Sequence, residues 1–290
     1  MLIKFTNVKH VYNIATPLEE QGLHNINLEI SQGEFICIIG STGSGKSTLL
    51  QHMNALLLPT SGEIIFPDGT VNGATKLNSK IIKKIRQKIG LAFQFPEYQL
   101  FEETVLKDIM FGPKNYNAIE SEAKKAACTA AQLVGLDEFI LDKSPFDLSG
   151  GQMRRVAIAG ILAMNPDILL LDEPTADLDP SGQKEIMDIF INLQQNHNKT
   201  IILVTHDMDI VAKYANKIIL MNQGTIELQG TPHEVFSQHE VLKNCGILLP
   251  TPAKISNEIM SYFNENEHTN LGETPPLTLE EFIEKYKKKS

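Results

Sequence analysis

The stretch FICIIGSTGSGKST, residues 35–48, joins a short apolar run to a glycine-rich loop and then to a helix-like segment. Glycines allow backbone N–H groups to curl around phosphate oxygens, and a following helix directs its positive end at the same oxygens. In this pattern Lys46 reaches the β- and γ-phosphates, and the Ser47 hydroxyl binds Mg²⁺. The stretch therefore predicts a phosphate-binding loop. Its residues are Gly40, Ser41, Thr42, Gly43, Ser44, Gly45, Lys46, Ser47 and Thr48.

Two further apolar runs, ILLLDE at 168–173 and IILVTH at 201–206, share the nearly continuous hydrophobicity of FICIIG. Such runs are typical of parallel strands that are covered on both faces. Segments with helical periodicity lie between them, such as residues 181–194, where Ile186, Ile189 and Leu193 share one stripe. The alternation predicts an α/β fold with a mostly parallel sheet. Together with the phosphate-binding loop, it indicates a P-loop NTPase core.

The other segments flank or interrupt this core. Residues 1–34 have the pattern of antiparallel strands, whereas about 95–165 has helical spacing and is expected to be a helical subdomain inserted in the core. From residue 231 onward the chain is punctuated by prolines. We therefore expect a nucleotide-binding domain over 1–230 and a C-terminal extension over 231–290.

A helix is expected near the C-terminus, over residues 278–289. Thr278 is followed three residues later by Glu281, as in a capping box, and an apolar stripe comes next. The stripe consists of Leu279, Phe282, Ile283 and Tyr286. It either docks on its own domain or contacts a partner. Lys287 to Lys289 are expected to be a solvated tail.

Composition narrows the class of protein. The net charge of −9 over 290 residues argues against a general nucleic-acid-binding protein, although it leaves room for a local basic patch. Three widely spaced cysteines indicate a reduced, cytosolic protein, in which Cys37 is a core residue. No apolar run is long enough to cross a bilayer and no signal peptide is evident, so the protein is expected to be soluble or peripheral.

Polar residues follow the second and third apolar runs. Asp172 ends a strand that is expected to be buried, where a carboxylate can hold the Mg²⁺ shell of a phosphoryl-transfer site. Glu173 follows at once and suits a general base for the attacking water. His206 ends the third run, and a side chain at the carboxyl end of a parallel strand faces the ligand crevice.

The stretch DLSGGQMRR, residues 147–155, predicts a second anion site. Ser149 can cap the helix that begins near Gly150, and Gly150 and Gly151 expose N–H groups at its positive end. Because the phosphate-binding loop already holds the phosphates, a second site on the same chain suggests that two chains sandwich one nucleotide.

LSGGQ, together with GSTGSGKST, LLLDEP, ADLD and TH, resembles the ATP-binding-cassette (ABC) family of ATPases over residues 1–230. The resemblance implies ATP and Mg²⁺ as cofactors and a dimer in which the P-loop of one subunit faces the LSGGQ of the other. It assigns the second face to Ser149, Gly150, Gly151 and Gln152.

The same resemblance implies roles for single residues. Tyr12 stacks on adenine, unless it is an edge-strand tyrosine of the core. Gln94 contacts Mg²⁺ or water, Asp179 communicates across the dimer, and His206 touches the γ-phosphate. Asp177 departs from the pattern, because a small residue is expected at that position.

The docking loop, FQFPEYQLFEE at 93–103, carries more apolar residues than an ordinary loop. Tyr98, Leu100 and Phe101 either form a small core or line a groove for a partner helix, and the glutamates Glu97, Glu102 and Glu103 would favour a basic residue there. The sequence of this loop, together with LSGGQMRRVAIAGILAMNP, resembles the ATPases of energy-coupling factor (ECF) transporters, in particular the second type of the ATPase pair.

That resemblance implies several partners. They are a second ABC ATPase subunit, a transmembrane scaffold that docks near residues 94–103, and a small substrate-binding membrane subunit reached through the scaffold. It also implies import of vitamins or transition-metal ions, with this chain at the cytoplasmic face of the membrane and no nucleic acid as a partner.

Other functions stay open at this point. One is the ATPase of another ABC importer class. Another is a soluble cassette ATPase of DNA repair or translation, although the chain has no long coiled coil and only one P-loop. A P-loop kinase is a further alternative, but a kinase site does not require an LSGGQ motif.

Overall fold

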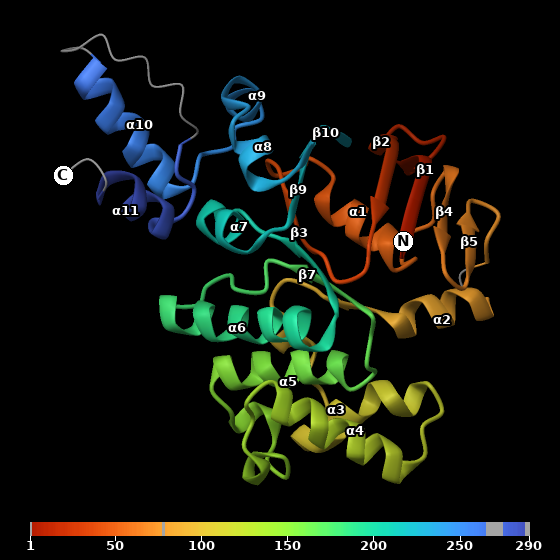
Figure 1. The fold of residues 1–290 in the computed structure, drawn as a ribbon. Helices are drawn as coiled ribbons and strands as arrows, with labels where there is room; N and C mark the ends of the chain where they lie inside the picture. The colour runs from red at the N-terminus through yellow and green to blue at the C-terminus, as the bar shows by residue number, and fades with distance from the viewer. Residues whose placement is uncertain (1, 77–78, 265–274, 288–290) are drawn as a thin grey trace. The chain divides into compact units, whose positions relative to one another are not determined.

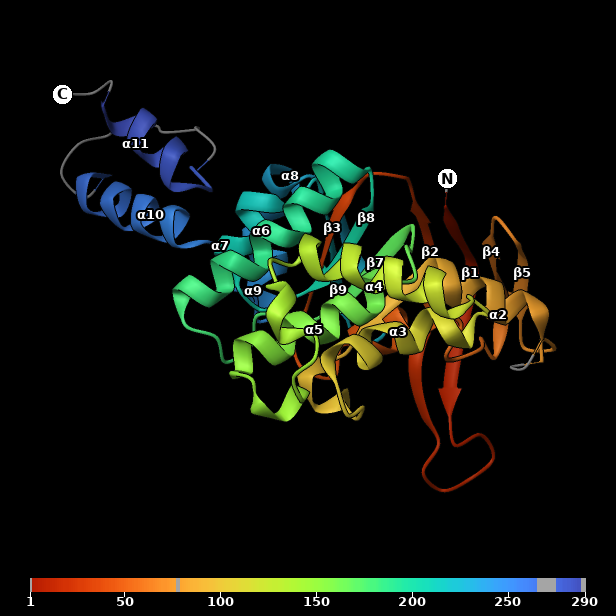
Figure 2. The same cartoon turned by 90° about the horizontal axis from the view of Figure 1, so that it is seen from below.

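The computed structural model describes residues 2–76, 79–264 and 275–287 (Figures 1 and 2). The chain forms two compact units, one of residues 1–34 and 47–203, the other of residues 35–46 and 204–290. Of the predicted solvated tail, Lys288 and Lys289 lie outside the described residues.

The first unit contains an antiparallel sheet in the order β2-β1-β4-β5. Its strands are β1 (Ile3–Tyr12), β2 (Glu20–Ile30), β4 (Ser61–Phe66) and β5 (Gly69–Asn72). Burial alternates along β1 and β2, and buried Phe5 lies opposite buried Leu28, as expected for a sheet with one covered face. The predicted antiparallel portion is therefore confirmed, and β4 and β5 extend it.

The parallel strands follow the predicted apolar runs. In the first unit β6 (Ile89–Ala92) pairs in parallel with β7 (Ile168–Asp172), and β8 (Thr200–Val204) is the other neighbour of β7. In the second unit β3 (Phe35–Ile39) pairs in parallel with β9 (Lys217–Asn222), and β10 (Thr225–Gly230) is antiparallel to β9. All residues of β3 and β8 are buried, which explains their continuous hydrophobicity. The predicted α/β fold with a mostly parallel sheet is confirmed.

Three helices of the first unit pack on one another: α3 (Val105–Asn115), α4 (Glu120–Leu133) and α5 (Gly150–Leu162) (Figure 2). A Cβ atom on Gly112 would lie 3.3 Å from the Gly160 carbonyl oxygen and 3.0 Å from Met164. Gly112 of α3 therefore permits close packing of α3 against the C-terminal part of α5. Short helices η1 (Pro96–Gln99), η2 (Glu138–Ile140) and η3 (Pro145–Asp147) link these elements.

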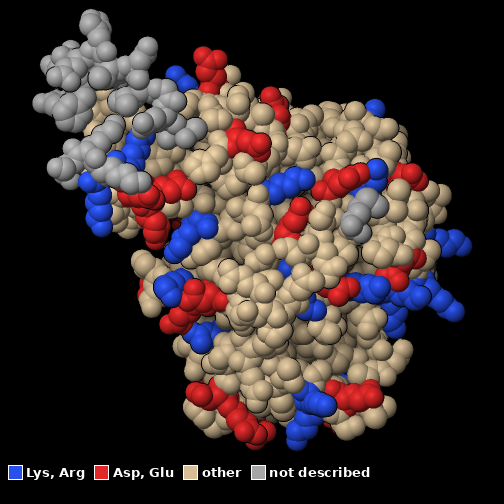
Figure 3. Space-filling model, in the orientation of Figure 1, with Lys and Arg blue, Asp and Glu red and all other residues tan. Residues whose placement is uncertain are grey.

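Other helices of this unit include α1 (Lys46–Met53), whose first residue belongs to the second unit, α2 (Lys80–Lys88) and α6 (Pro180–His197). Ser79 caps α2, and the helix buries Ile82 and Ile85. Its outer surface exposes Lys80, Lys83, Lys84 and Lys88, and Figure 3 shows the gathered positive side chains. An acidic chain thus carries one local basic patch.

The second unit ends in α7 (Met208–Tyr214), α8 (Pro232–Phe236), α9 (His239–Asn244), α10 (Thr251–Asn264) and α11 (Leu279–Lys287). Thr278 caps α11, since its hydroxyl accepts from the Glu281 N–H at 3.3 Å, whereas the Glu281 carboxylate accepts from Leu277. Phe282 contacts Tyr286, whose hydroxyl bonds Ser256 of α10, while Leu279 and Ile283 stay exposed. The stripe thus docks partly on its own chain. Within the described ranges, no helix has the length and hydrophobicity to cross a membrane.

Candidate functional site

The phosphate-binding loop depends on glycine where its backbone turns. Gly40 has φ +153°, and a Cβ atom there would lie 2.4 Å from the Met221 carbonyl oxygen, so no other residue fits. Gly43 has φ +79°, in the left-handed region, although a side chain there would meet open space. The Lys46 ammonium donates to the Gly40 and Ser41 carbonyl oxygens at 2.9 and 2.8 Å. The loop is therefore wrapped around the amine that is predicted to meet the phosphates.

The two strongest predicted Mg²⁺ ligands lie together. Ser47 Oγ donates to Asp172 Oδ2 at 3.0 Å, and both residues belong to the first unit. Asp172 is the last residue of β7, so the strand carries its carboxylate to the start of α1. A hydroxyl and a carboxylate are hard oxygen ligands of the kind that Mg²⁺ prefers. The pair fits the predicted metal site.

The segment after β7 is unusual in its backbone. Glu173 has φ +48° and Asp177 has φ +60°, both in the left-handed region. Such a conformation is costly for a residue with a side chain and is found mainly at functional sites. Aspartate tolerates it better than most residues, which accounts for Asp177 at a position where a small residue was expected.

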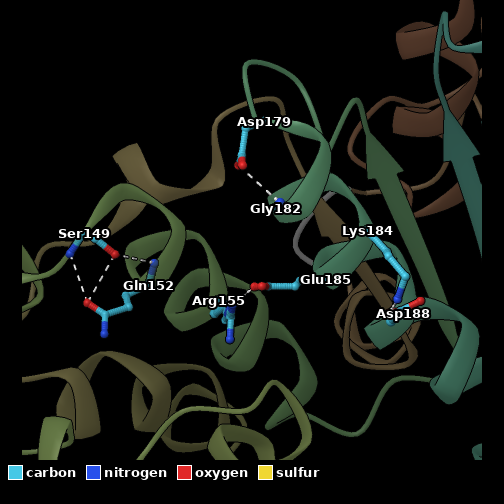
Figure 4. A network of polar contacts seen from close by, with 8 residues as sticks. All are labelled: Ser149, Gln152, Arg155, Asp179, Gly182, Lys184, Glu185 and Asp188. Atoms are coloured by element: carbon cyan, nitrogen blue, oxygen red, sulfur yellow. Dashed lines mark hydrogen bonds and ion pairs between the residues drawn. The ribbon is translucent and has the colours of Figure 1, made fainter.

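The LSGGQ stretch forms the predicted capped helix start. Ser149 Oγ accepts from the Gln152 N–H at 3.3 Å, and Gln152 Oε1 accepts from the Ser149 N–H at 3.1 Å (Figure 4). Gly150 and Gly151 are exposed, and a Cβ atom on either would meet nothing within 4 Å. The backbone at this helix start is thus open to a molecule outside the chain.

Asp179 has a role that sequence reasoning missed. Its carboxylate caps α6 by accepting from the Gly182 N–H at 3.2 Å (Figure 4). The pattern Asp-Pro-x-Gly, with Pro180 at the first helical position, is the signal that could have revealed the cap.

Tyr12 lies beside the phosphate-binding loop. Its hydroxyl and the Thr48 hydroxyl are 2.9 Å apart, and its ring is half-buried. The ring packs edge-on against His10, which in turn contacts His52 of α1, with centroid distances of 4.5 and 4.7 Å. Tyr12 is therefore fixed to the loop, and stacking on adenine stays a prediction.

The two histidines are buried neighbours that sequence reasoning missed. His10 Nδ1 bonds the Leu58 carbonyl at 3.0 Å, and His52 Nδ1 bonds the Thr48 carbonyl at 2.8 Å, so in each neutral ring Nδ1 carries the proton. Their Nε2 atoms are buried and have no hydrogen-bond partner among the residues that the structure describes. Burial lowers the pKa of His52 to about 4 and lowers that of His10 as well. Burial also raises the pKa of Cys37, the predicted core cysteine.

Gln94 and His206 occupy exposed positions at the ends of strands. Gln94 lies two residues after β6, in the first unit, and His206 two residues after β8, in the second. Asp207 caps α7 immediately after His206. Contact of either side chain with nucleotide stays a prediction.

In the docking loop, the structure separates the apolar residues. Leu100 is buried, at 7% exposure, whereas Tyr98 and Phe101 are 83% and 56% exposed. Phe101 packs edge-on against exposed Phe111 of α3, and the Phe101 and Glu102 N–H groups both donate to Asp108. Leu100 thus belongs to the core, and the two exposed rings form an outward face.

The expectation that Glu97 awaits a basic partner residue is wrong. Its carboxylate is already held by Arg154, with Oε1 2.6 Å from Nη2 and Oε2 3.0 Å from Nε. Glu103 also pairs within the chain, with Lys107. Arg154 is only 3% exposed, although arginine is rarely buried. Its spacing from Ile158 and Leu162 along α5 places it on the apolar stripe, which is the signal that could have revealed it.

Comparison with known proteins agrees with this geometry. The family model described as ABC transporter matches residues 23–176, and a model described as an AAA domain matches the shorter stretch 141–212. The energy-coupling factor transporter ATP-binding protein EcfA2 of Enterococcus faecalis is 51% identical over 90% of this chain and 90% of its own length. The EcfA2 proteins of Geobacillus kaustophilus and Bacillus subtilis are 48% and 50% identical, covering 98% and 92% of this chain and 96% and 95% of their own lengths.

Solved structures are similar as well. The structure of cbiO1 from Clostridium perfringens, part of the ABC transporter complex cbiONQ, has a TM-score of 0.72 at 38% identity and covers 91% of this chain and 98% of its own. A dimeric bacterial ABC transporter cassette has a TM-score of 0.69 at 34% identity and covers 80% of this chain and 99% of its own. These relatives favour the ECF alternative over the other importer, repair, translation and kinase alternatives. The chain belongs to the ABC transporter family and, within it, to the ATP-binding proteins of energy-coupling factor transporters.

Proposed function

We propose that this chain binds ATP with Mg²⁺ and hydrolyses it as one half of an ATPase dimer that energises an ECF importer of vitamins or transition-metal ions. The observation that carries this proposal is the presence of two phosphate-facing features on one chain. They are the glycine-dependent loop around Lys46 with its Ser47–Asp172 pair, and the capped, open helix start at Ser149.

Within the proposed site each residue has a distinct task. Gly40 to Thr48 cradle the phosphates through backbone N–H groups, and Lys46 meets the β- and γ-oxygens. Ser47 and Asp172, with Gln94, would hold Mg²⁺, which would neutralise charge on the phosphates. Glu173 accepts the proton of the attacking water, and His206 contacts the γ-phosphate. The γ-phosphate bond then breaks to give ADP and inorganic phosphate.

The second half of the site belongs to another ATPase subunit. Ser149, Gly150, Gly151 and Gln152 would face the γ-phosphate held by the partner subunit, because a capped helix start with open glycines is suited to an anion. Asp179 would communicate across the dimer, and Tyr12 would stack on adenine. The dimeric form of a similar cassette supports this arrangement.

The docking loop would bind the membrane scaffold through Tyr98 and Phe101, and Glu102 would favour a basic residue beside them. The scaffold would connect this chain to a small substrate-binding membrane subunit. This places the chain at the cytoplasmic face of the membrane. We also propose the division into a nucleotide-binding domain over 1–230, with the helical subdomain at about 95–165, and an extension over 231–290.

A pulldown of the tagged full chain from its native membrane, in mild detergent, tests the partners. We expect mass spectrometry to find a second ABC ATPase, one scaffold membrane protein and small substrate-binding membrane proteins. The double variant Tyr98→Ala/Phe101→Ala should lose the membrane proteins. Ile119→Ala, which removes an equally exposed apolar residue from the same unit, should retain them. Recovery of a conventional permease pair, ribosomes or DNA-repair proteins would overturn the ECF role.

A further inference from the structure

Arg154 makes four hydrogen bonds that join three separate segments of the first unit. It lies on α5, two residues after Gln152 of the LSGGQ stretch. Nε and Nη2 donate to the two oxygens of Glu97, at 3.0 and 2.6 Å. Nη1 donates to the carbonyl oxygens of Pro174 and Ala176, at 3.1 and 2.8 Å. One buried side chain thus binds the LSGGQ helix to both other segments.

The two segments held by Arg154 carry the residues proposed for chemistry and docking. Glu97 lies in η1, within the docking loop and three residues after Gln94. Pro174 and Ala176 lie between Glu173 and Asp179, where the left-handed conformations of Glu173 and Asp177 require support from their surroundings. The adjacent Arg155 pairs with Glu185 of α6, the helix that Asp179 caps (Figure 4). Two neighbouring arginines therefore fasten the segment from Pro174 to Glu185 onto α5.

The chemistry of this contact requires arginine. A planar guanidinium can bind a carboxylate with two N–H groups and still donate to two carbonyls on its other edge. A lysine ammonium has three donors on a single atom and cannot span both segments. The Phe95 ring lies 5.8 Å from the guanidinium carbon and adds a cation–π contact.

We propose that Arg154 is a positioning residue for hydrolysis, which holds the segment of Glu173 to Asp179 in its working conformation, and that Glu97 acts through Arg154 by fixing the guanidinium. The docking loop and the hydrolytic segment then share one side chain. The inference rests on ATP hydrolysis at the proposed site and does not require a particular membrane partner.

ATP turnover by the purified full chain, together with whatever subunits the pulldown recovers, tests this inference. The variants are Arg154→Gln, Arg154→Lys, Glu97→Gln and the double variant Arg154→Gln/Glu97→Gln. Lys184→Gln is the control, because it removes a cation from an exposed ion pair with Asp188 in the same unit. We expect Arg154→Gln to lower kcat at least about tenfold with KM for ATP within about threefold, since binding and hydrolysis use different residues.

The pattern across the set identifies the role. Glu97→Gln should lower kcat less than Arg154→Gln does, and the double variant should match Arg154→Gln alone, because Glu97 acts through Arg154. Arg154→Lys should rescue little. The proposal would be overturned by any of three results. They are kcat losses of the two single variants that add in the double variant, a KM that rises in proportion to the kcat loss, and an unchanged kcat in Arg154→Gln.

Backbone hydrogen exchange separates positioning from a general loss of stability. We expect faster exchange in residues 174–179 of Arg154→Gln and Glu97→Gln, with the phosphate-binding loop and the strands unchanged. Faster exchange throughout the first unit would overturn the proposal. A pulldown without membrane subunits would refute the proposed transport role and leave this inference to be decided by the kinetic and exchange results.

Discussion

Lys46 is the residue that we propose to meet the phosphates, and the Gly40 and Ser41 carbonyl oxygens of the loop accept hydrogen bonds from its ammonium. Lys46→Ala should lower ATP turnover by at least about 100-fold, because removing one preorganised donor to developing charge has an effect of that order. Turnover measured beside Lys184→Ala, an exposed lysine of the same chain, checks this. Unchanged turnover in Lys46→Ala would refute the phosphate-binding assignment.

Glu173 directly follows β7, has a left-handed backbone conformation and is the residue that we propose as the general base. Glu173→Gln keeps the size of the side chain but removes its basicity, so turnover should fall by about 100-fold to 10,000-fold while ATP binding persists. The variant should therefore accumulate as an ATP-bound dimer in size-exclusion chromatography, whereas Asp188→Asn, an exposed acid of α6, should behave as the wild type. A fully active Glu173→Gln chain would show that another group takes the proton.

Residues within one continuous motif could be predicted from sequence, and residues that act across segments could not. Gly43, Lys46 and Ser149 have conformations and hydrogen bonds that involve their immediate neighbours, and the structure gives each the predicted local geometry. Arg154 and Glu97 are 57 residues apart, so nothing local reveals their pairing. Glu97 was accordingly predicted to face a partner.

At the scale of elements, contact between β1 and α1 makes stability depend on pH. His52 is buried and neutral, and its pKa is lowered to about 4 from an ordinary value of 6.5. As pH falls below 6.5, the His52 side chain becomes protonated in the unfolded chain but stays neutral in the folded chain. Its contribution to the free energy of unfolding is therefore fully present above pH 6.5 and is lost progressively towards pH 4. The full loss from this group is about 3 kcal/mol.

Urea denaturation at pH 7.5 and 5.5 checks this expectation. The wild type should lose at least about 1 kcal/mol of unfolding free energy over this range through His52, and His10 should add to the loss. His52→Gln should show a smaller loss, while His239→Gln, an exposed control, should match the wild type. A loss that is the same in His52→Gln and the wild type would exclude His52 as its source.

Helices and strands with a strong hydrophobic pattern could be predicted from the sequence, but the strands with which they pair could not. Strands β3 and β8 are buried throughout and β7 is buried up to Leu171, so their hydrophobicity is continuous and identifies parallel strands. One neighbour of β3 is β9, with Ile36 opposite Lys217, and no local feature of either stretch specifies that register. Helix α2 carries the basic patch and was not predicted. It is short, and in the sequence its amphipathic pattern lies between strands of two different sheets.

At the scale of the whole molecule, the compact units do not follow the order of the sequence. Residues 35–46 join residues 204–290, because β3 pairs with a strand from the far end of the chain. A boundary based on composition cannot detect such an exchange. The proposed division at residue 230 therefore describes a change along the sequence and does not coincide with the compact units. The phosphate-binding loop begins in one of these units and ends in the other.

Whether a second chain completes the site can be tested at Gly151. A Cβ atom there would meet none of the described residues within 4 Å, so Gly151→Val should fold normally and bind ATP within about twofold of the wild type. If the partner's nucleotide closes on this helix start, the added side chain must obstruct it. We therefore expect loss of ATP-dependent association, measured by light scattering in the Glu173→Gln background.

The matched control is Lys125→Val, which places the same side chain at an exposed position of helix α4 in the same unit. It should associate normally, because a valine on an exposed helix costs only about 0.5 kcal/mol through helix propensity. Equal association of Gly151→Val and Lys125→Val would mean that nothing approaches the LSGGQ backbone. Since the described residues leave that backbone open, a selective loss in Gly151→Val would indicate that a second molecule approaches it.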